Sequence, residues 1–327
     1  MKILITGIAG FVGNHLVEHL KDSGFDGGLE IMGIDVNLDN FHYRNKNIPG
    51  VKIKTSKIDL RDKEEVTGLV GSFKPDIIYH LAAQSSVGYS WKKPVETFEI
   101  NVFGGINILE SVKECCPSCR ILVVCTAEEY GRQKKGVDKP IDEDFKIQPT
   151  NPYAISKSAL DFFSTIYQKT SELLIFVSRS FNHIGPGQSD RFVISDFAKQ
   201  IAEIEKGIQD PVILVGNINV YRDFLDVRDV ISAYGCIINN GKPGEVYNVC
   251  SGKRSKISDI LDMLLSYSSV KNIKVKVDKN KLRPIDLYSV YGNNKKLILD
   301  TGWKQNYNIK TSLLDTLKWW RKKKGVI

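Results

Sequence analysis

Short apolar runs alternate with amphipathic segments along the first half of the chain. The apolar runs have the length and composition of buried strands, and the longer segments between them repeat their apolar residues with helical spacing. The predicted strands are residues 2–6, 30–35, 51–60, 76–83 and 120–125. The predicted helices are residues 11–24, 62–73 and a long segment within 93–116. This alternation predicts an α/β fold built on a doubly wound parallel sheet.

The second half of the chain is less regular. A helix over about 152–169 and a strand over 173–180 continue the first pattern, and turns then become frequent. Later helices are predicted at 192–207, near 256–268 and at the end of the chain. We therefore expect a dinucleotide-binding domain formed by residues 1–181 plus about 221–250. A smaller, interleaved α/β substrate domain should comprise about 182–220 and 251–327.

Composition and charge narrow the possible partners. The 327 residues are 42% hydrophobic, enough for a large core, and no apolar run reaches the roughly 20 residues of a membrane span. The first residues lack a signal peptide's pattern, so a cytoplasmic protein without membrane contact is expected. Much of the formal charge of +8 lies in the terminal run "KWWRKKK", which favours a solvated helix end over nucleic-acid binding. A positive chain also suits a phosphate-bearing substrate.

Cysteine and histidine spacing gives no metal-binding pattern. Three of the six cysteines lie in "CCPSC", without a second pair at matching distance, and the five histidines are scattered. No metal site is expected. Cys116 and Cys119 have the spacing of a weak redox candidate.

A glycine-rich turn follows the first strand directly. In "TGIAGFVG", Gly7 permits a tight turn, Gly10 allows backbone to approach a pyrophosphate, and Gly13 allows the helix to pack on the strand. The first helical N–H groups, at Phe11 and Val12, then face the phosphates. This strand, turn and helix context favours dinucleotide binding over a merely structural turn.

Asp35 ends the second predicted strand, where a carboxylate can bind the adenosine ribose. A plain turn aspartate is the alternative. Because this carboxylate would repel a 2′-phosphate and no arginine precedes Arg44, NAD(H) is favoured, with NADP(H) possible.

Two later segments supply candidate acid–base chemistry. Pro152 starts a helix on which Tyr153 and Lys157 lie four positions apart, so an ammonium could lower the pKa of the phenol. Thr126 closes the strand 120–125 in "TAEEYG". It can cap the following turn or form the floor of an active site, and beside the other motifs the active-site role is favoured.

These motifs together resemble the extended short-chain dehydrogenase/reductase family. "TGIAGFVG", "HLAA" at 80–83, "TAEEYG", "YAISK" and "RSFNHIGPG" occur in the family's order and cover nearly the whole chain. The resemblance implies that Thr126, Tyr153 and Lys157 are catalytic and that the protein is a homodimer, paired through the helices that follow Trp91 and Pro152. It also implies further cofactor contacts. These are Asp59, Leu60, Leu81, Ala82 and Ala83, together with Tyr153 and Lys157.

The second half is similar to reductases of GDP-4-dehydro-6-deoxy-mannose and, next, to GDP-mannose 4,6-dehydratases. The likeness implies a nucleotide-sugar substrate bound by Glu128, Asn182, Val193, Lys199, Arg222, Arg283 and Asp286. Each charged residue among them has a plain structural alternative. Arg222 could pair with Asp223 at the surface, Lys199 could be a solvated helix lysine, and Glu128 could be a helix-start carboxylate.

Ala127 is the residue that distinguishes reduction from dehydration. Dehydratases of this kind commonly carry a hydroxyl or carboxylic residue after the threonine, and alanine can transfer no proton. We therefore expect reduction of the C4 keto group of a GDP-4-dehydro-6-deoxy-hexose to a GDP-6-deoxy-hexose of the rhamnose type. A dehydratase or epimerase is the main alternative, and a non-catalytic regulator that only binds dinucleotide is the lesser one.

Overall fold

The computed structural model describes residues 1–22, 28–43, 49–131, 139–282 and 287–327. Its centre is a parallel sheet of seven strands in the order β11-β6-β5-β4-β1-β2-β3. The strands are β1 (Lys2–Thr6), β2 (Leu29–Asp35), β3 (Val51–Lys57), β4 (Ile77–His80), β5 (Arg120–Thr126), β6 (Leu174–Ser180) and β11 (Val246–Val249). The predicted doubly wound parallel sheet is therefore confirmed.

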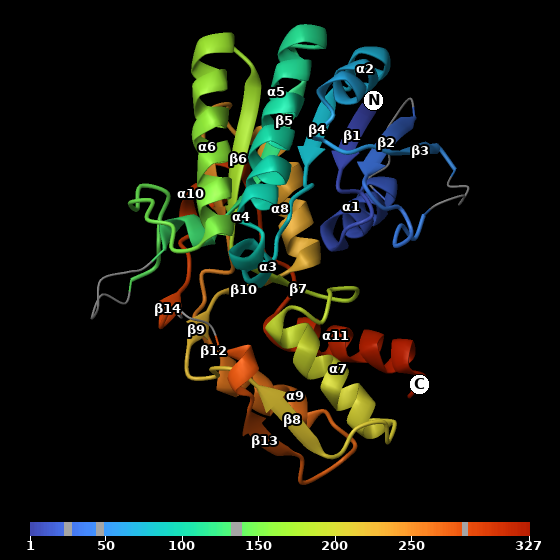
Figure 1. The fold of residues 1–327 in the computed structure, drawn as a ribbon, viewed down its shortest axis with the longest axis vertical. Coiled ribbons are helices and arrows are strands. Elements are labelled where there is room, and N and C mark those ends of the chain that lie inside the picture. The colour runs from blue at the N-terminus through green and yellow to red at the C-terminus, as the bar shows by residue number, and fades with distance from the viewer. Residues whose placement is uncertain (23–27, 44–48, 132–138, 283–286) are drawn as a thin grey trace.

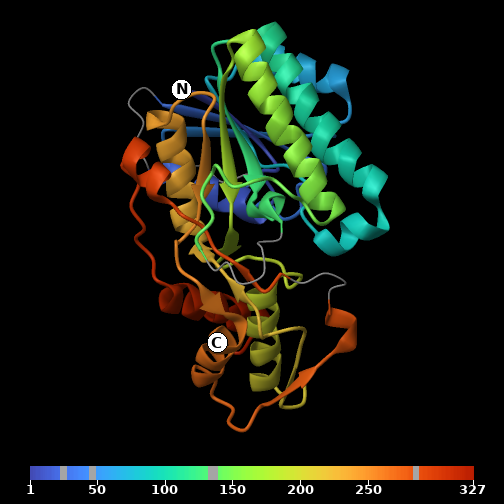
Figure 2. The same cartoon turned by 90° about the vertical axis from the view of Figure 1, so that its left-hand side faces the viewer.

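Helices cover both faces of this sheet because its strands are apolar on both sides. One face is covered by α1 (Phe11–Asp22) and α8 (Val227–Asn240), whose buried residues share a core with β1 and β2. The other face is covered by α2 (Lys63–Phe73), α5 (Gly104–Cys115) and α6 (Pro152–Ser171). Figure 2 shows α5 and α6 on one side of the sheet and α8 on the other. The short helix α10 (Lys295–Thr301) adds Leu297 to the core beneath α8.

A second body lies beyond the carboxyl ends of the sheet strands (Figure 1). Its core joins α7 (Val193–Glu205), α9 (Ile257–Ser266) and α11 (Ile309–Lys324). Its strands are short: β8 (Val212–Val215) pairs with β13 (Lys274–Val277), and β9 (Tyr221–Arg222) lies between β12 (Ser255–Lys256) and β14 (Ser289–Val290). The parallel pair β7 (Asn182–Ile184) and β10 (Phe224–Asp226) lies between the two bodies in Figure 1.

The segment 93–116 was predicted to contain one long helix, but the structure divides it. It is divided into α4 (Pro94–Phe98), a π-helical turn (Glu99–Phe103) and α5, and a further helix, α3 (Val87–Lys92), precedes it. The buried Asn101 lies in the π-helical turn, accepts a hydrogen bond from the backbone N–H of Gln84 (2.7 Å) and donates one to its carbonyl (3.1 Å). We attribute the irregular turn to this tie to a distant loop, because a π-turn redirects side chains within a helix.

None of the helices in the described part of the chain combines the length and the apolar character that a bilayer crossing requires.

Candidate active site

The glycine loop joins β1 to α1 with its backbone held against the next strand connection. Gly7 has a positive φ of 72°, and a β-carbon there would lie 2.8 Å from the backbone nitrogen of Ala82. A β-carbon at Gly13 would lie 2.5 Å from the carbonyl oxygens of both Gly7 and Ile8. These two glycines are therefore required by close backbone packing.

Gly10 is the less crowded member of the loop. A β-carbon there would meet only the Gly7 carbonyl, at 3.1 Å. The first N–H groups of α1, at Phe11 and Val12, are the kind that a helix leaves without an internal partner. The loop therefore offers a backbone cradle of the type that a pyrophosphate fits.

Asp35 ends β2 beside this loop, as predicted. Its carboxylate accepts hydrogen bonds from the N–H of Ala9 (3.1 Å) and of Asn37 (3.3 Å). Burial raises the pKa of Asp35 and these hydrogen bonds lower it. Asp59 lies on the connection after β3, where a bidentate pairing with Arg61 lowers its pKa.

The loop after β4 holds Leu81, Ala82 and Ala83 next to the glycine turn. The Leu81 N–H bonds to the Thr6 carbonyl (3.2 Å), and the Ala82 N–H bonds to the Thr6 hydroxyl (3.1 Å). That hydroxyl also bonds to Nδ1 of the buried His80 (2.9 Å). Thr6 thus couples the two cofactor-side loops, and nothing in its sequence context indicated this.

Thr126 caps the 3₁₀-helical turn Ala127–Tyr130 at the end of β5. Its side chain accepts a hydrogen bond from the N–H of Glu128 (3.3 Å), and its own N–H donates to Glu129 (3.0 Å). Thr126 therefore caps this turn, which was the less favoured of the two roles predicted for it. The Thr126 side chain also lies close enough to the Tyr153 hydroxyl to lower the pKa of that phenol, so the cap does not exclude the expected active-site role.

Tyr153 and Lys157 project from the first turns of α6. Asn151 caps this helix by accepting from the Ala154 N–H (2.8 Å), and Pro152 occupies its first position. Burial is the main influence on the pKa of both side chains: it raises the pKa of Tyr153, against the opposite influence of the nearby Thr126, and lowers the pKa of Lys157. We expected the Lys157 ammonium to lower the pKa of the Tyr153 phenol, but burial has the larger effect and raises it.

A buried ionic cluster lies behind these residues. Arg179 on β6 pairs with Asp161 (2.8 Å), and its Nε lies 3.6 Å from Glu129 Oε2. Cys125, Glu129 and Asp161 place ligand-type atoms within 4.8 Å of one another, but the guanidinium already supplies the positive charge there. The pattern Thr-x-x-Glu in "TAEE" is the signal that could have revealed Glu129.

Glu128 and Ala127 occupy different surroundings. Glu128 accepts a hydrogen bond from Asn151 (3.1 Å), which joins the turn after β5 to the start of α6. Ala127 is buried in a small apolar cluster with Phe181 and Cys250. Position 127 therefore offers neither an ionisable group nor a polar environment.

The residues expected on the substrate side are partly brought together. Asn182 bonds through both its N–H and its side-chain amide to the carbonyl of Asp223 (3.2 and 3.0 Å), next to Arg222. Val193 and Lys199 lie on α7, where Lys199 pairs with Asp190 (2.8 Å) instead of being simply solvated. Arg283 and Asp286 lie outside the described residues.

Asp223 is not a surface partner of Arg222. It is fully buried and accepts four hydrogen bonds, from the N–H and hydroxyl of Ser251 and from the N–H groups of Gly252 and Gly292. Arg222 donates instead to the carbonyls of Tyr221 (2.8 Å) and Leu287 (2.7 Å). The buried aspartate thus anchors the chain segment that carries Arg222.

Comparison with known proteins agrees with this geometry. The family model described as GDP-mannose 4,6 dehydratase matches residues 4–316. GDP-6-deoxy-D-mannose reductase from Pseudomonas aeruginosa is 34% identical over 98% of this chain and 97% of that enzyme. The solved structure of RMD from Pseudomonas aeruginosa with NADPH has a TM-score of 0.84 at 33% identity, covering 98% and 99% of the two chains.

A second solved structure extends the comparison. UDP-glucose 4-epimerase from Thermus thermophilus in complex with NAD has a TM-score of 0.83 at 28% identity, covering 98% of this chain and 99% of the other. The resemblance that the motifs indicated is confirmed. The chain belongs to the GDP-mannose 4,6-dehydratase family within the extended short-chain dehydrogenases/reductases, which are NAD(P)-dependent nucleotide-sugar enzymes.

Proposed function

We propose that the protein reduces the C4 keto group of a GDP-4-dehydro-6-deoxy-hexose to the hydroxyl of a GDP-6-deoxy-hexose of the rhamnose type. The observation that carries this proposal is a protonated Tyr153 close to the Thr126 side chain, together with the buried alanine at position 127. A reduction needs one proton donor, whereas an elimination of water needs an additional acid and base. The similarity to a GDP-6-deoxy-D-mannose reductase supports the same direction.

Tyr153 is suited to the role of acid. Because burial raises its pKa, the phenol holds its proton at neutral pH and can donate it to the developing alkoxide. Thr126 would hydrogen-bond the same oxygen and orient it. Lys157, buried one helical turn away, would stabilise the phenolate that remains after the transfer.

The cofactor is proposed to lie on the glycine loop, and when bound it supplies the hydride. Gly7, Gly10 and Gly13 would hold its pyrophosphate with Phe11 and Val12, and Asp35 would bind the adenosine ribose. Further contacts would come from Asp59, Leu60, Leu81, Ala82 and Ala83. Relatives have been solved with NADPH and with NAD, and the carboxylate of Asp35 supports a preference for NAD(H) here.

The nucleotide diphosphate would lie between β7, β9 and α7. Arg222 is oriented by two carbonyls next to Asn182, and the forked guanidinium is a group that suits phosphate oxygens. Lys199 would have to exchange its pairing with the exposed Asp190 for a phosphate, a small cost because such pairs contribute about 0–1 kcal/mol. Val193 and Glu128 are proposed contacts from α7 and the turn after β5, and Arg283 and Asp286 remain sequence-based proposals.

A homodimer is proposed from the outer faces of α3, α4, the π-helical turn Glu99–Phe103 and α6. Large apolar side chains are exposed there, an arrangement typical of surfaces that bind another protein. They are Tyr89, Trp91, Val95, Phe103, Ile155, Phe162, Phe163 and Ile166. Sedimentation of the wild-type protein and of Phe162→Glu tests this, since a dimer through this face should dissociate in the variant. We also propose a cytoplasmic location, in keeping with six cysteines that are all free.

The decisive assay follows the reduced nicotinamide while GDP-4-keto-6-deoxy-mannose is added to purified enzyme. We expect oxidation of NADH or NADPH with formation of a GDP-6-deoxy-hexose, and a loss of at least about 10²-fold in Tyr153→Phe. Tyr167→Phe, on the same helix but bonded to Glu110, is the matched control and should keep its activity. Absence of cofactor oxidation would contradict the proposal.

Dehydration is the second candidate, favoured by one observation. Glu128 is held by Asn151 near Thr126, where a carboxylate could act as an acid or base. A dehydratase regenerates its own oxidised cofactor, so it would convert GDP-mannose without added nucleotide. That result, combined with no net NADH or NADPH oxidation, would replace reduction by dehydration.

A further inference from the structure

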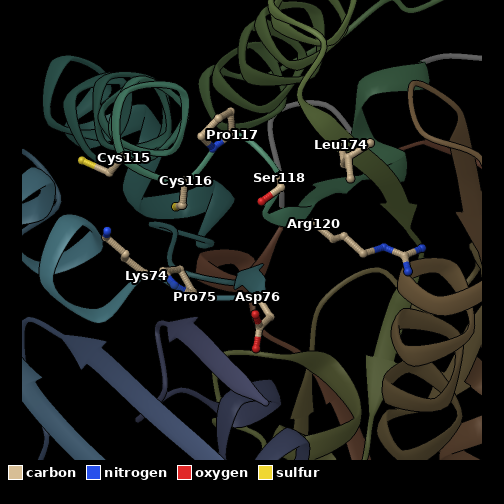
Figure 3. Close-up of a pocket in the computed structure, with 9 residues that line it drawn as sticks. All are labelled: Lys74, Pro75, Asp76, Cys115, Cys116, Pro117, Ser118, Arg120 and Leu174. Carbon is tan, nitrogen blue, oxygen red and sulfur yellow. The ribbon is translucent and has the colours of Figure 1, made fainter.

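A cavity of about 480 Å³ lies at the amino-terminal ends of the sheet strands, and the glycine loop lies at their carboxyl ends. It is formed where β4, β5 and β6 begin, whereas Thr126 marks the other end of β5. Lys74, Asp76, Cys116, Ser118 and Arg120 are among its lining residues, as Figure 3 shows.

Two cysteines meet at this cavity across a tight turn. The Cys119 N–H donates to the Cys116 carbonyl (2.9 Å) over Pro117 and Ser118, and the Cys119 thiol donates to the Arg120 carbonyl (3.7 Å). Such a turn brings its first and last Cα atoms within about 7 Å, and disulfides span about 4.4–6.8 Å between Cα atoms. The backbone is therefore already close to the geometry of a disulfide.

The two thiols differ in access. Cys116 is half-buried and lines the cavity, whereas Cys119 is only 1% exposed. A reagent in the cavity can therefore reach the Cys116 thiol. The Cys119 thiol is shielded from such a reagent but lies next to Cys116 within the protein.

The two thiols also differ in the direction in which their surroundings shift the pKa. Cys116 is the C-cap residue of α5, where the helix dipole opposes a thiolate. The neighbouring Cys119 thiol and the charge of Lys74 nevertheless lower the pKa of Cys116, while the neighbouring Cys116 thiol and burial raise the pKa of Cys119. Lower thiol pKa and access are what make one cysteine of a pair reactive.

We propose that Cys116 and Cys119 form a reversible dithiol–disulfide site, in which Cys116 is the attacking thiolate and Cys119 the resolving thiol. The oxidant is a low-molecular-weight disulfide such as glutathione disulfide. This site is separate from the nucleotide-sugar chemistry, and it links the end of α5 to the start of the strand that carries Thr126.

The exchange balances in two steps. The Cys116 thiolate attacks glutathione disulfide, forms a mixed disulfide and releases one glutathione thiolate. The Cys119 sulfur then attacks the Cys116 sulfur, its proton passes to the departing second glutathione, and the intramolecular disulfide forms. Two cysteines lose two electrons in total, and glutathione disulfide gains them to give two glutathione molecules.

The full-length, reduced protein should be incubated with mixtures of glutathione and glutathione disulfide, acid-quenched, alkylated and mapped by peptide mass spectrometry. We expect a Cys116–Cys119 disulfide that excess glutathione reverses. Cys119→Ser should instead accumulate a single glutathione adduct on Cys116, and Cys116→Ser should form neither product.

Cys115 provides the matched control. Its thiol faces away from Cys116, towards the Thr67 carbonyl on α2, so Cys115→Ser should react like the wild type (Figure 3). Thermal unfolding of each reduced variant checks that the fold is kept. The proposal fails if no Cys116–Cys119 disulfide forms in folded wild-type protein, or if Cys115 is modified as fast as Cys116, where we expect at least about a tenfold difference.

Discussion

Replacing Glu129 by glutamine should stabilise the protein at neutral pH, and increasingly so as the pH rises. The Glu129 carboxyl is fully buried, and one oxygen accepts from the Thr126 N–H while the other has no hydrogen-bond partner. Burial, followed by the charge of Asp161, raises the pKa of Glu129 well above its ordinary value. The folded protein therefore keeps this proton to a higher pH than the unfolded chain does.

The magnitude follows from this difference in proton binding. An unfolded glutamate titrates near about pH 4.3, so above that pH the folded state holds one more proton than the unfolded state. Stability then falls by about 1.4 kcal/mol per pH unit until the folded carboxyl itself ionises. Glutamine has no such dependence and can still accept from the Thr126 N–H. For each pH unit over which the folded carboxyl stays protonated, the variant's advantage in free energy of unfolding should grow by about 1.4 kcal/mol.

Urea unfolding of both proteins at a series of pH values measures this difference. Glu129→Ala is the control, because it removes the acceptor of the Thr126 N–H and leaves a cavity. It should lose about 2–4 kcal/mol relative to the glutamine variant at every pH. Parallel stability curves for wild type and Glu129→Gln would refute the reasoning, since they would mean that Glu129 is ionised in the folded state and balanced by Arg179.

Two further predictions concern the cofactor loop. Gly13→Ala should destabilise the protein by about 1–3 kcal/mol in thermal unfolding, because the new β-carbon would lie 2.5 Å from the Gly7 carbonyl. Gly68→Ala, exposed and uncrowded within α2, should stabilise it by about 0.5–1 kcal/mol, and equal effects at the two glycines would contradict the packing argument. Asp35→Asn keeps an acceptor for the Ala9 N–H but removes the charge, so the ratio of kcat/KM for NADPH over NADH should rise about tenfold. An unchanged ratio would show that Asp35 does not discriminate against a 2′-phosphate.

The sheet and the glycine loop were predictable because their signals are local. Each strand is a short apolar run. Gly7, Gly10 and Gly13 all lie within seven residues of the end of the first strand. The π-helical turn was not predictable, because Asn101 is held by Gln84, whose position relative to the helix only the folded chain defines. Helical periodicity continues through that segment and conceals the irregularity.

The second body was harder to predict for a different reason. Several of its strands are only two or three residues long, too short for an alternating pattern to appear. The buried Asp223 looks like a surface residue in the sequence, since its partners Ser251, Gly252 and Gly292 come from two later segments. The domain boundaries and the roles of the substrate-side residues stay predictions.

The cap formed by Thr126 is compatible with the active-site role that we propose for it. A threonine hydroxyl has one proton to donate and two lone pairs to accept. In the structure one lone pair accepts the hydrogen bond from the Glu128 N–H, and the Thr126 side chain lies close enough to Tyr153 to lower the pKa of that phenol. The cap therefore fixes the direction in which the hydroxyl can donate. The buried Glu129, by accepting from the Thr126 N–H, fixes the backbone from which that hydroxyl projects.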